Sequence, residues 1–152
     1  METICKLAEP ADTDTLLQLM REYYRFDHLH FDEQVVRSAL EKFIGNKALG
    51  RLWIIVHAGE TVGYLVLTLG FSFEFGGYDA FIDEVYIRES QRGRGIGKFA
   101  LQVAEEECRG LGVRALHLEV ERENTNAQAL YRKVGFVEHD RYLLTKRISP
   151  FR

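Results

Sequence analysis

Residues 80–112 constrain the fold of this chain most, because a strand pattern there passes through a glycine-rich turn into a helix pattern. Residues 80–87 alternate, which places Phe81, Asp83, Val85 and Ile87 on one face and Ile82, Glu84 and Tyr86 on the other. After the turn, apolar or small residues recur at helical spacing at Gly97, Leu101, Ala104, Cys108 and Leu111. Residues 113–120 again have a strand pattern, so the two strands that flank this helix are expected to be parallel.

The rest of the chain supplies elements of both kinds. We expect a first strand at 3–7, a helix starting near Pro10, a second helix from Asp32 to about Gly45, and a hairpin of residues 52–56 and 61–69. Residues 70–79 are expected to form a loop or a bulged stretch. A short helix follows Asn124 and stops at Gly135, and the tail alternates enough for one or two final strands. The prediction is one α+β domain over residues 1–152, with a mixed and mostly antiparallel sheet.

Composition narrows the classes of partner. The net charge of −3 gives no indication of nucleic acid or of an anionic membrane surface. The N-terminus lacks a secretory signal pattern, and the two cysteines, Cys5 and Cys108, fit a reducing compartment, so a cytoplasmic location is expected. The five histidines show no metal-ligand spacing, so no metal is expected. Cys108 falls on the apolar helix stripe, which favours a buried structural role over a nucleophilic one.

The turn itself is suited to an anion. It consists of Arg92, Gly93, Arg94, Gly95, Ile96 and Gly97. Glycines let a phosphate approach the backbone, a helix start offers unpaired N–H groups, and arginines add charge-assisted hydrogen bonds. The spacing fits neither a P-loop nor a dinucleotide-binding fingerprint. A pyrophosphate site is therefore predicted, with a flexible basic surface turn as the alternative.

A second motif lies one strand-helix-strand unit downstream. It reads N-x-x-A-x-x-L-Y-x-x-x-G-F and is formed by Asn124, Ala127, Leu130, Tyr131, Gly135 and Phe136. With Arg92, Gly95 and Gly97 meeting the pattern [QR]-x-x-G-x-[GA], the chain resembles the GNAT (GCN5-related N-acetyltransferase) superfamily. The order of elements is similar over essentially the whole chain. The resemblance implies an acyl-CoA N-acyltransferase fold in which the strand at 80–87 is splayed from the strand at 113–120.

The resemblance also implies a site. Acetyl-CoA would lie between the splayed strands, with its pantetheine amides on the strand backbone at Val85, Tyr86 and Ile87 and its pyrophosphate on residues 92–97. Asn124 would approach the cofactor from the other side. The backbone N–H near Val85 would stabilise the oxyanion, and Tyr131 would protonate the departing thiolate. Packing on the helix face is the alternative role of Tyr131.

The acceptor must lose a proton, because an amine attacks a thioester only when it is neutral. Asp83 and Glu84 are adjacent carboxylates in an apolar strand, so each is a candidate base or anchor for a substrate ammonium, with structural salt bridges as the alternative. The pair resembles the acidic pair of the spermidine/spermine acetyltransferase branch, whose glutamate falls at Asp83. The glutamate base of the histone acetyltransferase branch would fall at Phe81 and does not carry over.

The leading hypothesis is an acetyl-CoA-dependent N-acetyltransferase that acts by direct transfer in a ternary complex on a small cationic amine. Glu74 and Asp79 would add negative charge near the acidic pair, and Tyr23, Tyr24 and Phe26 are candidates to line the acceptor pocket. The alternatives are a lysine or N-terminal peptide acceptor and a non-catalytic acyl-CoA-binding module. A homodimer, formed through residues 71–75 or the C-terminal strands, is expected by analogy with the family.

Overall fold

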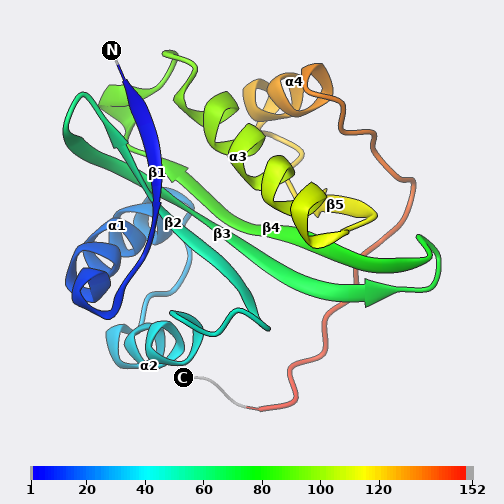
Figure 1. The fold of residues 1–152 in the computed structure, drawn as a ribbon, viewed down its shortest axis with the longest axis horizontal. Coiled ribbons are helices and arrows are strands. Elements are labelled where there is room, and N and C mark those ends of the chain that lie inside the picture. Colours follow the sequence, from blue (N-terminus) through cyan, green and yellow to red (C-terminus); the bar gives the residue numbers. More distant parts are fainter. Residues whose placement is uncertain (1, 150–152) are drawn as a thin grey trace. The chain divides into compact units, whose positions relative to one another are not determined.

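The computed structural model describes residues 2–149, which divide into two compact units that meet between Glu119 and Val120. Figure 1 follows the elements along the chain. The first unit contains β1 (Thr3–Leu7), α1 (Thr13–Phe26), α2 (Glu33–Phe43), β2 (Gly50–His57), β3 (Glu60–Ser72), β4 (Gly77–Ile87), α3 (Ile96–Leu111) and β5 (Ala115–Leu118). Two short 3-10 helices, Pro10–Asp12 and Glu89–Gln91, precede α1 and α3. The second unit contains α4 (Thr125–Lys133).

The five strands of the first unit form one sheet in the order β1-β2-β3-β4-β5. The first four strands are antiparallel neighbours, and β5 joins β4 in parallel, from Asp79 opposite Ala115 to Ile82 opposite Leu118. This mixed, mostly antiparallel sheet with flanking helices confirms the predicted fold class. The strand predicted at 113–120 shortens to β5. Residues 70–79, expected as a loop or a bulged stretch, largely extend the β3–β4 hairpin.

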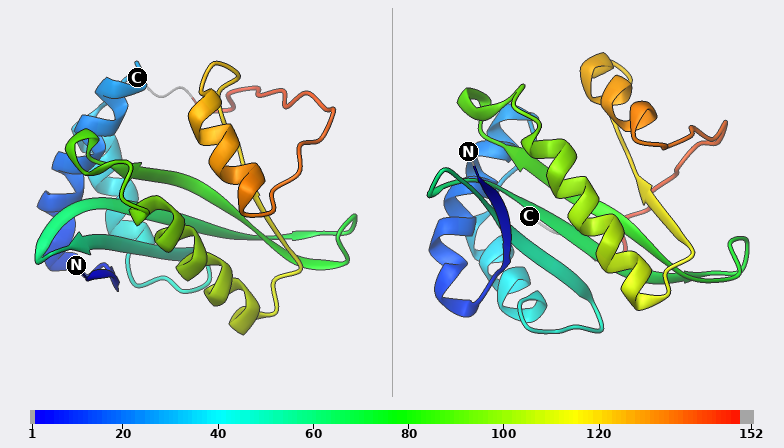
Figure 2. Two further views of the ribbon diagram at one scale, coloured as in Figure 1. Left: turned by 90° about the horizontal axis from the view of Figure 1, so that it is seen from above. Right: turned by 45° about the horizontal axis from the view of Figure 1, so that its top comes forward.

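Helices cover both faces of the sheet, with α1 and α2 on one face and α3 on the other (Figure 2). Under α1 and α2 the core is built from helix residues such as Leu16 and Leu40 and from the sheet residues Ile54, Tyr64 and Val66. On the opposite side, α3 buries Ile96, Ala100, Leu101, Ala104 and Cys108. This confirms the middle of the predicted stripe, whereas Gly97 at its start is half-buried and Leu111 at its end is exposed. The sheet therefore lies between two apolar layers.

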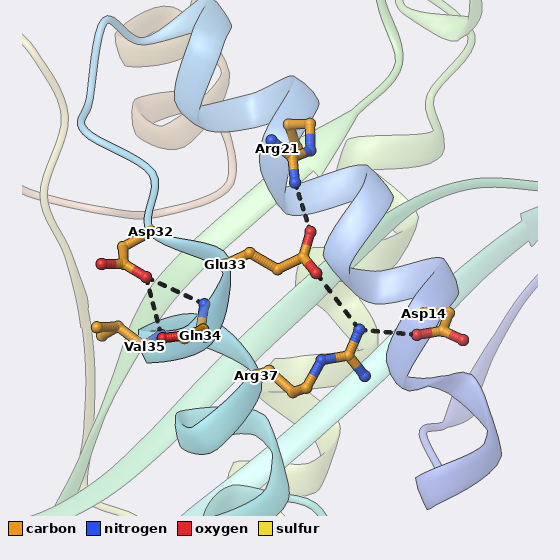
Figure 3. Close-up of polar contacts among 7 residues, drawn as sticks. All are labelled: Asp14, Arg21, Asp32, Glu33, Gln34, Val35 and Arg37. Carbon is orange, nitrogen blue, oxygen red and sulfur yellow. Dashed lines mark hydrogen bonds and ion pairs between the residues drawn. The ribbon is translucent and has the colours of Figure 1, made fainter.

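Figure 3 shows how α2 begins beside α1. The Asp32 carboxylate accepts hydrogen bonds from the backbone N–H groups of Gln34 and Val35, which caps the helix where the sequence predicts its start. Arg37 of α2 pairs with Asp14 of α1 at 3.0 Å, and Glu33 pairs with Arg21. These ion pairs are exposed and each contributes little, so the buried leucines carry most of the packing of α1 and α2 on the sheet.

A β-bulge at Asp83 corrects the predicted faces of β4. Leu67 of β3 lies opposite Ile82, but the next β3 residue, Val66, lies opposite Glu84, so Asp83 is the extra residue. Consecutive β3 residues point to opposite faces, and so do their partners. Ile82 therefore lies on the α3 face, while Glu84 and Tyr86 lie on the face covered by α1. The prediction that all three share one face is wrong.

The second unit begins with a loop that leads to α4 and ends in an extended tail. Asn124 caps α4 by accepting a hydrogen bond from the backbone N–H of Ala127. Gly135 follows the helix with a φ of 106°, in agreement with the predicted stop. Between Val134 and Ser149 the described residues contain no strand, so the expected final strands are absent there. Most apolar residues of this tail, including Tyr142 and Leu144, are exposed and are not paired with a strand in the described range.

Candidate functional site

The strands β4 and β5 separate part of the way along β4. Their pairing ends at Ile82 and Leu118, while β4 continues to Ile87 paired only with β3. The resemblance implied such a splay, and the fork opens one residue before the bulge at Asp83. One edge of β4 from Asp83 onward is consequently left without a neighbouring strand among the described residues.

The backbone at this open edge points outward at alternate residues. The N–H of Arg88 donates to Val62 of β3, and the antiparallel register makes Tyr86 face β3 in the same way. Val85 and Ile87 therefore direct their N–H and C=O groups to the open edge. The Ile87 carbonyl accepts a hydrogen bond from Arg92 Nε at 2.8 Å, so the Val85 groups and the Ile87 N–H are the ones left for an extended ligand.

The glycine-rich turn leads into α3 just after this edge. Gly93 and Gly95 have φ values of 76° and 79°, a region that favours glycine, and a Cβ built on either would meet nothing within 4 Å. The first helical hydrogen bond of α3 runs from the N–H of Phe99 to the carbonyl of Gly95. Ile96, Gly97 and Lys98 therefore have N–H groups with no acceptor inside the helix. An open, positively polarised turn of this kind fits a pyrophosphate.

Arg92 is held at the rim of the turn. Besides its bond to Ile87, its guanidinium lies 4.4 Å from the centre of the Phe26 ring and 5.8 Å from that of Tyr86. Arg92, which the sequence predicts to bind the pyrophosphate, thus also joins the turn to the C-terminal end of α1. Arg94 is exposed on the same turn, and Ile96 is buried, so Ile96 anchors the helix while its backbone N–H remains at the surface-facing start.

The two adjacent carboxylates have different surroundings. Glu84 accepts hydrogen bonds from the phenols of Tyr24, at 2.6 Å, and Tyr64, at 2.7 Å, one on each carboxylate oxygen. Burial raises the pKa of Glu84 although both phenols act to lower it. Asp83 is exposed and makes no hydrogen bond or ion pair with residues 2–149, yet partial desolvation raises its pKa as well. Asp83 is thus the carboxylate available to a ligand.

Tyrosines surround Glu84. The ring of Tyr23 contacts those of Tyr24, Tyr64 and Tyr86, with centroids 5.6 to 6.4 Å apart. Burial and the negative charge of Glu84 raise the pKa values of Tyr24 and Tyr64 far above the ordinary range, so both phenols stay protonated and keep donating. The candidates Tyr23 and Tyr24 therefore lie together with the acidic pair, whereas Phe26 packs under Arg92.

A second polar group closes the end of β4. Arg88 forms two hydrogen bonds to Glu22 of α1, at 3.1 and 3.0 Å, and Tyr86 donates to the same carboxylate. The sequence analysis missed Glu22, Arg88 and Tyr64. These residues are tens of positions apart in the chain, so no local sequence pattern links them. The one available signal was Arg88 itself, a charge directly after an apolar strand that requires a partner.

The remaining predicted residues, Asn124 and Tyr131, belong to the second unit. The Asn124 side chain caps α4, and the Tyr131 ring packs edge-on against Phe136 at 6.0 Å. Burial raises the pKa of the Tyr131 phenol, so this hydroxyl remains a proton donor at neutral pH.

The thiols and the candidate metal-binding side chains do not form a second reactive site among the described residues. Burial raises the pKa of the Cys5 and Cys108 thiols to about 11, which suppresses the nucleophilic thiolate. Residues 2–149 contain no group of three or more His, Cys, Asp or Glu side chains placed to hold a metal ion. No helix in that range is both long enough and apolar enough to span a membrane.

A fork between parallel strands, an open strand edge and a glycine-rich helix start are the features that the sequence predicts for the acyl-CoA acyltransferase class. The profile of the acetyltransferase (GNAT) family matches residues 13–136. The chain therefore belongs to the GNAT family of acetyltransferases, in agreement with the resemblance found in its two motifs.

Curated relatives are named as acetyltransferases. The D-amino-acid N-acetyltransferase HPA3 of Saccharomyces cerevisiae is 23% identical over 88% of this chain and 84% of its own length. An uncharacterised N-acetyltransferase of Bacillus subtilis, YycN, is 39% identical over 41% of this chain. The methionine sulfoximine/methionine sulfone acetyltransferase of Pseudomonas aeruginosa is 34% identical over 52% of this chain. The chain spans less than half the length of the last two relatives, 40% and 45%.

Solved structures share the fold. An integron cassette protein, HFX_CASS3, from the mobile metagenome of a salt marsh superposes with a TM-score of 0.85 at 37% identity, over 96% of this chain and 91% of its own. The aminoglycoside N-acetyltransferase AAC(6')-Iy in complex with CoA superposes with a TM-score of 0.83 at 14% identity, over 97% and 96% of the two chains. At that identity the second match supports the fold alone.

Proposed function

We propose that this chain is an N-acetyltransferase that moves the acetyl group of acetyl-CoA to the primary amine of a small cationic acceptor. The observation that carries the proposal is the open edge of β4 beside the glycine-rich turn. The N–H groups of residues 96–98 would receive the pyrophosphate, and the backbone at Val85 and Ile87 would bond the pantetheine amides as an added strand does. Acetyl-CoA supplies an acetyl thioester activated for attack.

Asp83 is our candidate for the anchor of the acceptor. It is exposed at the bulge, free of protein partners in the described range, and next to a wall of tyrosine rings. A carboxylate beside aromatic faces favours an ammonium group over a neutral one. Glu84, with both oxygens occupied by phenols, serves to hold that wall in place. Curated relatives named for D-amino acids and for methionine sulfoximine fit a small acceptor, and the spermidine/spermine-like branch is the form we favour.

Three chain groups would act on the reacting atoms by direct transfer in a ternary complex. The N–H of Val85 would stabilise the negative charge that develops on the acetyl carbonyl oxygen. A base would take the proton that the amine releases. Tyr131 would donate its phenolic proton to the departing thiolate, a role that rests on the family motif and on a phenol that burial keeps protonated.

The first experiment measures thiol release from acetyl-CoA across polyamines, aminoglycosides, amino acids and lysine peptides, with binding of CoA followed by calorimetry. We expect turnover with a small cationic amine, and an Asp83→Asn variant should raise KM for that amine about 10-fold or more while leaving CoA affinity unchanged. The conservative control is Asp140→Asn, in the tail of the second unit.

Other outcomes separate the alternatives. Turnover confined to peptides would favour a protein acceptor, and an equal response of neutral and cationic amines would contradict the acidic anchor. Tight CoA binding with no turnover, unchanged by Tyr131→Phe, would favour a binding module. Absence of CoA binding would refute the proposed function.

A further inference from the structure

A histidine–aspartate pair lies at the fork, outside the groups described so far. His117 of β5 places Nε2 3.2 Å from Oδ2 of Asp79 on β4, and the two side chains are only 19% and 14% exposed. The imidazole lies between the rings of Phe75 and Phe81, with centroid distances of 5.0 and 4.9 Å. Asp79 is the charged group that β4 directs at the ring, and Arg114 and Glu119 are the nearest charges along β5. The pair is held on both sides and is shielded from most of the solvent.

The position of this pair follows from the strand register. His117 is paired with Phe81, one step before the last β4–β5 pair and two residues before the bulge at Asp83. Phe81 lies opposite Thr68 and Glu84 opposite Val66, and these two β3 residues share a face. His117 therefore faces the same side of the sheet as Glu84 and its tyrosines, at the point where the strands begin to separate.

The carboxylates already described leave the role of the base open. Both oxygens of Glu84 already accept phenolic hydrogens, and Asp83 is the proposed anchor of the ammonium group. In the pair, an oxygen of the Asp79 carboxylate lies 3.2 Å from Nε2, which favours the ring hydrogen on Nε2 and leaves the lone pair of Nδ1 to accept a proton. A carboxylate behind an imidazole also stabilises the imidazolium once it forms.

On the basis of the proposed function, we infer that His117 is the general base of the transfer and that Asp79 is its positioning residue. Nδ1 of His117 takes one proton from the acceptor ammonium, and the amine nitrogen forms a bond to the acetyl carbon. The bond from that carbon to the CoA sulfur breaks, and the thiolate leaves with the electron pair. The second amine proton passes to water as the amide forms, and the thiolate takes the phenolic proton of Tyr131. Exchange with water then returns the tyrosinate to its phenol and the His117 imidazolium to its neutral form, so that one proton is released per turnover. The products are an N-acetyl amine and CoA thiol.

The test compares His117→Gln with the wild type in kcat/KM from pH 6 to 9, using the best amine of the panel. We expect a loss of about 100-fold or more at pH 7, with unchanged CoA affinity and disappearance of the acidic limb of the profile. The deficit should shrink for an amine whose own pKa is near 8, because that amine is already partly neutral. Asp79→Asn should lower kcat less and shift the limb, and Asp79→Glu should partly restore it.

The matched control is His57→Gln, since His57 also contacts a residue of the neighbouring strand, Thr3, at 2.8 Å, but lies far from β5 on β2. It should keep wild-type kcat/KM. Nitrogen-15 NMR of the wild type offers a readout besides activity: the His117 ring signals should move on addition of CoA with the amine, whereas those of His57 should not.

The outcomes separate this inference from the proposed function. If the wild type acetylates amines and His117→Gln stays within 3-fold of it at every pH, the inference is wrong and the function stands. An equal deficit for all amines, with a fall in melting temperature and no NMR response, would assign the pair a structural role and also refute the inference. A wild type that acetylates no amine would refute both.

Discussion

At the scale of single residues, the unusual feature is a half-buried carboxylate whose two oxygens each accept a hydrogen bond from a phenol. Glu84 lies on β4, Tyr64 on β3 and Tyr24 on α1, so the Glu84 side chain links three elements. Desolvation outweighs the two hydrogen bonds and raises the pKa of Glu84 above its ordinary value of 4.5. Ionisation of Glu84 therefore destabilises the folded state, so the contribution of Glu84 to the free energy of unfolding depends on pH.

A Glu84→Gln variant should show this dependence. The folded state binds the Glu84 proton more tightly than the unfolded state, so the wild type loses stability as pH rises from about 4.5 through the raised pKa. Below that window, wild type and variant should differ by a constant amount. Within it, the variant should gain on the wild type. Denaturant unfolding at intervals from pH 4 to 8 measures the difference, and a gap between the two curves that is independent of pH would contradict the assignment.

At the scale of elements, β3 and β4 leave no room for a side chain at Gly63. A Cβ built at this residue would lie 2.0 Å from the carbonyl oxygen of Tyr86, a backbone atom that cannot rotate away. Gly63 also lies opposite Ile87, at the end of the strand where the open edge meets the turn. The glycine is therefore required for the pairing that positions the proposed cofactor edge.

We expect Gly63→Ala to lower the free energy of unfolding by about 1–3 kcal/mol and to weaken CoA binding, because β4 must shift to admit the methyl group. The control is Gly110→Ala. Its Cβ would meet nothing within 4 Å, and alanine favours the helix, so that variant should be neutral or slightly more stable. Urea unfolding and calorimetry measure both effects. If Gly63→Ala had the same free energy of unfolding and the same CoA affinity as the wild type, the close approach of the two strands at this residue would be refuted.

At the scale of the whole molecule, the tip of the β3–β4 hairpin carries an aromatic cluster in contact with solvent. Phe73 is 92% exposed, and Phe71 packs against both Phe73 and Tyr78 with centroid distances of 5.6 and 5.7 Å. Exposed aromatic residues that contact one another are typical of an interface. This cluster includes part of the stretch, residues 71–75, that the sequence analysis connected with a homodimer.

We expect the wild type to be a dimer at micromolar concentration. The Phe73→Ser variant should shift this equilibrium toward the monomer, and its melting temperature should equal that of the wild type at the same protein concentration. Sedimentation velocity over a concentration series provides the measurement. Phe99→Ser, on the partly exposed start of α3, is the control and should leave the association unchanged. A wild type that sediments as a monomer at every concentration would refute the dimer.

The sequence by itself determined the features that are local in the chain. Periodicity located the helices, because a stripe such as Leu101, Ala104 and Cys108 depends only on neighbours one turn away. The two motifs likewise identified the family and the turn, since glycine conformation and a helix start are local properties. The cap at Asp32 followed for the same reason.

Only the tertiary structure decided what depends on register and on distant partners. The bulge at Asp83 is set by pairing with β3, so alternation within β4 alone put Ile82 on the wrong face. Tyr64 donates to Glu84 from 20 residues away and Tyr24 from 60, and His117 meets Asp79 because β5 returns parallel to β4. The tail has the alternating pattern of a strand, but residues 134–149 form no strand. An alternating segment becomes a strand only when it pairs with the edge of another strand, which its own sequence does not determine.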